Sequence, residues 1–139
     1  MRHLAALAAT ALLAACAVIP DPIVAPPAPE GSPVALGQAV RVGALTVTPV
    51  AVVEDSRCPI NARCVWAGRL VVRTRIDGDG WRDSADIRLG ENYGTHGTVI
   101  ALASGEPGKL AERETRPQDY RFTYAAGWNV ATDPGPPNR

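Results

Sequence analysis

Residues 70–89 of the chain read LVVRTRIDGDGWRDSADIRL. One face of the first half carries Leu70, Val72, Thr74 and Ile76, and one face of the second half carries Trp81, Asp83, Ala85, Ile87 and Leu89. Alternation with a period of two is typical of a strand that buries one face. Because the two runs flank Asp77-Gly78-Asp79-Gly80, they predict a β-hairpin around an Asp-Gly turn.

Similar short runs continue on both sides of this hairpin. Strands are expected at residues 39–42, 45–54, 98–103 and 120–124, and the alternation changes phase at Pro49. A proline with a phase change predicts a β-bulge or an edge position. We expect an all-β domain over residues 34–132, an antiparallel β-sandwich or small barrel of about six or seven strands.

Composition limits the function classes. The 139 residues contain 14 basic and 14 acidic side chains, so the formal net charge is zero. A protein that binds nucleic acid normally carries a basic surplus, which is missing here. The length fits one small domain.

The first residues predict export. Met1–His3 carry positive charge, and residues 4–13 are uncharged and mostly Ala and Leu. About ten apolar residues are too few for a spanning helix, which needs roughly 20. Residues 1–15 are therefore predicted to be a signal peptide.

The signal peptide ends at Leu13-Ala14-Ala15-Cys16, which resembles the lipobox of bacterial lipoproteins. The resemblance implies cleavage before Cys16 and a lipid anchor on this residue, with a diacylglyceryl group on its sulfur and an acyl chain such as palmitate on its amine. It also implies the cell envelope, and Ala17 favours the outer membrane, facing the periplasm. The alternative is an ordinary secretory signal in which Cys16 is incidental. Two or three acyl chains would hold the protein firmly at the membrane.

Proline dominates the segments at both ends of the expected domain. Residues 16–33 contain six prolines and predict a tether, either an extended spacer or a disordered one. Fully extended, 17 residues after Cys16 reach roughly 50 Å. Residues 133–139 are expected to be a disordered tail.

The two other cysteines are Cys58 and Cys64. In an oxidising compartment such a pair is predicted to form a disulfide, which stabilises by about 2.4 kcal/mol on the chain-entropy model. We expect Asp55, Arg57 and Arg63 to form a polar cluster at the base of the loop. Trp66 is expected to begin the next strand and to pack on the disulfide.

Residues 55–68 read DSRCPINARCVWAG. The segment resembles the D-S-R-C-P…C-V-W-A-G signature of small bacterial lipoproteins and secreted domains that have no assigned activity. The resemblance implies a common fold and brings no substrate or catalytic residue with it.

The favoured hypothesis is a lipid-anchored structural or binding module of the cell envelope. Its partner would be peptidoglycan, another envelope protein or a small ligand. The candidate binding residues are Arg57, Arg63, Trp66, Tyr93 and His96.

Two alternatives remain open. A small envelope hydrolase would use the glycine-rich loop Glu91–Gly97, and it requires Tyr93 and His96 to converge with a carboxylate in a concave pocket. An inhibitor of an extracellular enzyme would present the Cys58–Cys64 loop, which must then project from the domain.

Other chemistry finds little support. A zinc site needs three or four ligands, and His96 is the only histidine after the signal peptide. Asp77 does not begin an EF-hand loop, because position 12 is Arg88 instead of glutamate. The two cysteines lack the C-x-x-C spacing of redox enzymes. We therefore assign no catalytic residue, metal or cofactor.

Overall fold

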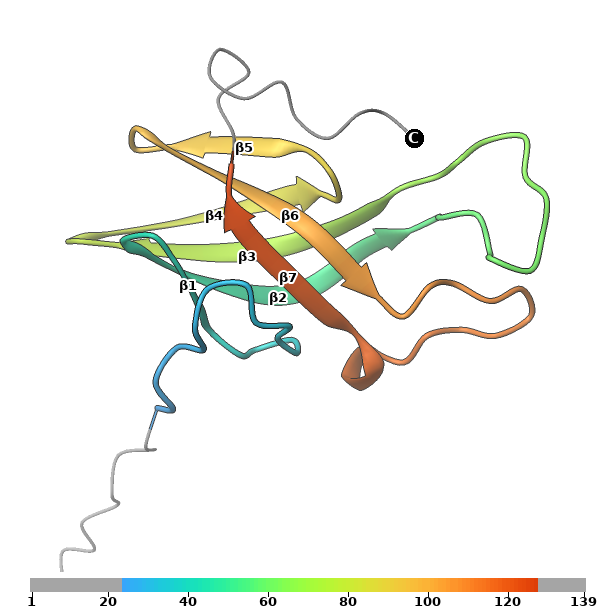
Figure 1. The fold of residues 1–139 in the computed structure, drawn as a ribbon, viewed down its shortest axis with the longest axis horizontal. Coiled ribbons are helices and arrows are strands. Elements are labelled where there is room, and N and C mark those ends of the chain that lie inside the picture. The colour runs from blue at the N-terminus through green and yellow to red at the C-terminus, as the bar shows by residue number, and fades with distance from the viewer. Residues whose placement is uncertain (1–23, 128–139) are drawn as a thin grey trace, which may run out of the picture.

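The computed structural model describes residues 24–127 of the chain (Figure 1). This range contains seven β-strands and one short 3-10 helix. The elements are β1 (Val40–Val42), β2 (Leu45–Asp55), β3 (Leu70–Gly78), β4 (Trp81–Arg88), β5 (Asn92–Thr95), β6 (Thr98–Glu106), η1 (Pro117–Asp119) and β7 (Arg121–Ala126). The predicted all-β fold is confirmed.

The strands form two antiparallel sheets, with the orders β1-β2-β3-β4 and β5-β6-β7. The predicted hairpin is the pair β3–β4. Its last register pair joins Gly78 to Trp81, so the turn consists of Asp79 and Gly80 alone. Gly80 has a φ of +74°, which a glycine adopts without steric cost.

The core lies between the two sheets, whose strands cross in Figure 1. Its buried hydrophobic residues include Val47, Leu70, Val72, Ile76, Ile87, Ile100, Leu102, Tyr120, Phe122 and Tyr124. The predicted inward face of β3 is thus confirmed. Its one polar member, Thr74, shares a 2.8 Å hydrogen bond with the hydroxyl of Tyr124, so neither buried hydroxyl is left without a partner.

β2 is bent by two bulges. The register with β3 shifts between Pro49 and Ala51, as the phase change predicts, and again between Val52 and Glu54. The carbonyl of Pro49 accepts a hydrogen bond from the Gly37 amide (2.7 Å), on the edge of β2 away from β3. As a consequence of the shifts, Val50 and Val53 are 48% and 46% exposed on a strand that is otherwise largely covered.

The segment Glu91–Gly97, which was predicted to be a loop, contains the strand β5. Its glycine content does not indicate a strand. Asn92–Thr95 pairs with the start of β6, and the pairing outweighs the low β-propensity of Gly94. His96 (φ 46°) and Gly97 (φ 74°) form the two-residue turn between them.

The sheet begins before residue 34. Ala28 forms a parallel bridge with Val40, its amide donates to Ala39 O, and its carbonyl accepts from the Arg41 amide, both at 2.8 Å. The end of the proline-rich segment is therefore attached to β1. Residues 1–15, Cys16 and the tail 133–139 lie outside the described residues. Within residues 24–127, no helix has the length and apolarity to cross a bilayer.

Candidate functional site

Residues 56–69 connect β2 to β3 and project from one end of the domain; we call them the cystine loop (Figure 1). Cys58 and Cys64 are joined by a disulfide, with their Cα atoms 5.8 Å apart. Two backbone hydrogen bonds close the base, from Ser56 N to Arg69 O (2.9 Å) and from Cys58 N to Ala67 O (3.0 Å). The predicted disulfide is confirmed, and the loop projects as an inhibitor would require.

An ion pair holds the loop where β2 ends. Arg57 donates to both carboxylate oxygens of Asp55 (2.8 and 2.9 Å), and the Tyr120 hydroxyl donates to one of them (2.8 Å). The Asp55 side chain is only 9% exposed and that of Arg57 only 16%. Burial alone would raise the pKa of Asp55, but the hydrogen bonds from Arg57 and Tyr120 outweigh it and lower the pKa below its usual value.

Arg57 also reaches the other sheet. Its Nη1 donates to Gly105 O at the end of β6 (2.7 Å), and its Nη2 donates to Pro107 O (3.1 Å). Because its guanidinium donors are taken up within the domain, Arg57 braces the loop and presents little surface to a ligand.

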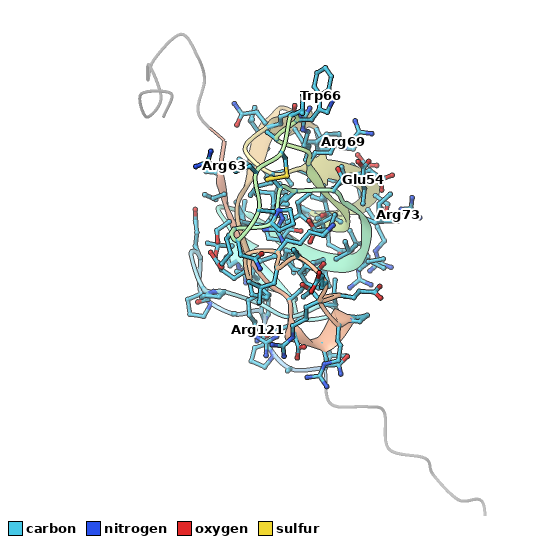
Figure 2. All side chains as sticks on the ribbon, turned by 90° about the vertical axis from the view of Figure 1, so that its right-hand side faces the viewer. Glu54, Arg63, Trp66, Arg69, Arg73 and Arg121 are labelled. Carbon is cyan, nitrogen blue, oxygen red and sulfur yellow. A yellow bond between two sulfur atoms is a disulfide. The ribbon has the colours of Figure 1, made fainter. Side chains whose placement is uncertain are left out.

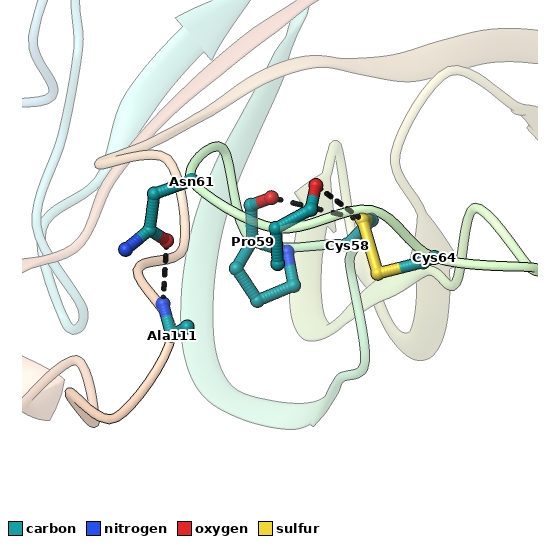
Figure 3. The surroundings of a disulfide bond; sticks show 6 residues. Cys58, Pro59, Asn61, Cys64 and Ala111 are labelled. Atoms are coloured by element: carbon teal, nitrogen blue, oxygen red, sulfur yellow. Dashed lines mark hydrogen bonds between the residues drawn. A yellow bond between two sulfur atoms is a disulfide. The ribbon is translucent and has the colours of Figure 1, made fainter.

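The cystine loop rests on a second loop, residues 107–116, which we call the 107–116 loop. Lys109 Nζ donates to Asp55 O (2.7 Å), and the Ile60 amide donates to Lys109 O (2.9 Å). The Ala111 amide donates to the Asn61 side chain (2.8 Å), as Figure 3 shows beside the disulfide. The two loops are thus held together as one unit.

The tip of the cystine loop exposes apolar side chains. Val65 is 91% exposed and Trp66 83%, and Figure 2 shows Trp66 pointing away from the rest of the domain. Two expectations are therefore wrong. Trp66 does not begin a strand, because β3 starts only at Leu70. Arg63 does not join Asp55; it is exposed and has no ion pair within residues 24–127.

A groove of about 820 Å³ lies beside the cystine loop, between β2 and the 107–116 loop. Its apolar lining includes Leu36, Val50, Val53 and Leu110, and its charged lining includes Glu54, Lys109, Glu112, Arg113 and Glu114. Sequence reasoning missed this groove, since its two walls lie about 60 residues apart in the chain. The only sequence signal was the phase change at Pro49, which predicts a bulge near the groove residues Val50 and Val53.

Tyr93 and His96 belong to a different cluster. The hydroxyls of Tyr93 and Thr95 donate to Asp83 (3.2 and 2.9 Å), and Thr95 also contacts His96 Nδ1 (2.9 Å). The His96 ring stacks on Trp81 at 3.8 Å. Hydrogen bonds from Thr95 and the Ser84 amide hold the pKa of Asp83 below its usual value.

This cluster connects β4 to β5. Tyr93 and His96 do converge with a carboxylate, as the hydrolase hypothesis requires, but none of these residues lines the groove beside the cystine loop or the smaller hollow near Arg116. Within the described range, no three His, Cys, Asp or Glu side chains gather closely enough to hold a metal ion.

No protein-family model matches the chain, and neither a curated protein nor a solved structure matches it significantly.

Removing the disulfide should lower the stability of the domain moderately. The double change Cys58→Ser and Cys64→Ser is expected to reduce the free energy of unfolding by about 2.4 kcal/mol, because the unfolded chain regains the entropy of a seven-residue loop. Urea denaturation of both proteins under oxidising conditions measures the difference. An unchanged free energy of unfolding would mean that the hydrogen bonds at the base suffice to hold the loop.

Proposed function

We propose that the protein is a lipoprotein of the bacterial cell envelope, anchored through Cys16, that binds an envelope protein with its cystine loop. The anchor is supported by the lipobox-like sequence Leu13–Cys16 at the end of a signal-like segment. A disulfide also fits an oxidising compartment such as the periplasm.

The exposure of Val65 and Trp66 on a loop fixed at both ends carries the binding proposal. Tryptophan and arginine are enriched among the residues that dominate binding energy at protein interfaces. A loop that is already ordered loses little conformational entropy on binding. Inhibition of an extracellular enzyme is one form that such binding would take.

Photo-crosslinking in intact cells tests the binding role. A photoreactive amino acid at Val65 should give one discrete protein adduct, whereas the same amino acid at Arg82, exposed on β4, should not. Trp66→Ala, introduced beside the photoreactive position, should abolish the adduct. Equal labelling from Val65 and Arg82 would contradict a binding loop.

Peptidoglycan is tested in parallel by sedimentation with purified sacculi. Three results together would show that the loop binds peptidoglycan: the protein sediments with sacculi, Trp66→Ala abolishes this sedimentation, and no protein adduct forms. The protein-binding proposal would then be wrong.

The anchor makes its own prediction. Cys16→Ser removes the thiol that carries the lipid, so the protein should disappear from the outer-membrane fraction and its N-terminal peptide should carry no acyl mass. The double change Cys58→Ser and Cys64→Ser is the matched control and should leave fractionation unchanged. A Cys16→Ser protein that fractionates like the wild type would contradict the anchor.

A further inference from the structure

We infer that the partner of the cystine loop is a second copy of this chain, whose groove receives the loop tip while its own tip enters the groove of the first. This inference rests on the proposed function of the loop. The tip consists of Arg63, Val65 and Trp66. The groove is the one between β2 and the 107–116 loop.

The tip and the groove are both apolar where they would meet. The tip exposes Val65 and Trp66 by 91% and 83%, and the groove exposes Val50 and Val53 by 48% and 46%. Four of the six exposed large hydrophobic residues of the described chain therefore lie on these two surfaces. A hollow of about 820 Å³ is in the size range that encloses drug-sized groups, which an indole ring and a valine do not exceed.

Their charges are complementary. Glu112, Arg113 and Glu114 line the groove side by side in the sequence, so this stretch carries a net charge of −1. Arg63 is exposed at the tip and complements Glu112 and Glu114. None of the three forms an ion pair within residues 24–127. Opposite charges on the two surfaces favour this docking and set its orientation.

Their positions allow a closed pair. Tip and groove lie at the same end of the domain, because Pro59 and Lys109 line the groove and Ile60 bonds to Lys109. When a two-fold axis passes beside this end, each copy contributes one tip and one groove, so that every contact forms twice. Two copies anchored in one membrane would also meet at a high effective concentration.

Energy transfer between copies in a membrane tests this inference. The full-length lipidated protein carries donor or acceptor dyes on a C-terminal tag and is reconstituted in vesicles of phosphatidylethanolamine and phosphatidylglycerol. The wild type should show more transfer than random placement gives, and the transfer should decrease as lipid dilutes the protein. Trp66→Ala and Val53→Arg should each weaken the pairing at least about tenfold, since central tryptophans dominate such contacts.

Mixing the two variants is the decisive arm. The Trp66→Ala chain keeps its groove and the Val53→Arg chain keeps its tip, so the mixture should recover part of the transfer that each lacks alone. Val24→Arg, at an 86% exposed valine in the N-terminal segment, is the matched control and should behave like the wild type.

Transfer at the random level in the wild type, or a mixture no better than its components, would overturn the second-copy partner. The Val65 photo-adduct separates this failure from that of the proposed function. An adduct with the mass of a different protein would mean that the cystine loop binds another partner. The absence of any adduct would contradict both the second-copy partner and the binding role of the loop.

Discussion

Replacing Gly68 with alanine is expected to open the base of the cystine loop. Gly68 has a φ of +67°, and a Cβ built on it would overlap the carbonyl oxygen of Ser56. That oxygen belongs to the backbone, so the clash is relieved only if the two strands of the loop base separate. The hydrogen bond from Ser56 N to Arg69 O lies at this point and should be lost.

Gly80→Ala is the matched control. Gly80 has a similar φ of +74°, but nothing lies within 4 Å of its built Cβ. It should therefore show only the cost of a left-handed alanine, about 1–2 kcal/mol. Gly68→Ala should lower the free energy of unfolding by at least about 2 kcal/mol more, because the steric clash adds to the same backbone strain. Chemical denaturation measures the free energy of unfolding of both variants. Equal losses would mean that the loop base accommodates the Cβ of residue 68 without a free-energy cost.

Asp55→Asn should have the second large effect. The change removes the negative charge that Arg57 faces, in a site where both side chains are mostly buried. Breaking a buried pair in this way leaves a charge uncompensated, and the expected loss is about 3 kcal/mol. Asp86→Asn breaks the exposed pair with Arg73 and should cost less than about 1 kcal/mol.

The effect of Asp55→Asn should depend on pH. The pKa of Asp55 is lower in the folded protein than its usual value, so the carboxylate stabilises the fold above about pH 4. This contribution is lost as the pH falls through the lowered pKa. The difference in free energy of unfolding between wild type and variant should therefore shrink from pH 5 toward pH 2. A difference that stays constant over this range would contradict the assigned role.

Local patterns predicted most of the sheet structure. The β3–β4 hairpin depends on alternation and an Asp-Gly turn, which are neighbours in sequence. The bulge at Pro49 likewise had a local signal. β5 had none, because its four residues include Gly94 and its only support is the pairing with β6.

The site was less predictable than the fold. The disulfide followed from the count of cysteines, and Asp55 and Arg57 were expected to meet. Their further partners, Gly105 and Tyr120, lie 48 and 65 residues away and were not foreseen. Arg63 and Trp66 were placed wrongly, because Arg63 forms no ion pair within residues 24–127 and β3 begins only at Leu70, so Trp66 stays in the exposed part of the loop.

The bridge between Ala28 and Val40 limits how far the domain could stand from the proposed lipid anchor on Cys16. Only residues 17–27 would then remain as the tether, which at about 3.1 Å per residue spans at most roughly 34 Å. A lipid on Cys16 would confine the domain to a shallow zone above the bilayer. Interaction partners would then have to lie close to the membrane surface, and the domain could not reach a target deep in the periplasm.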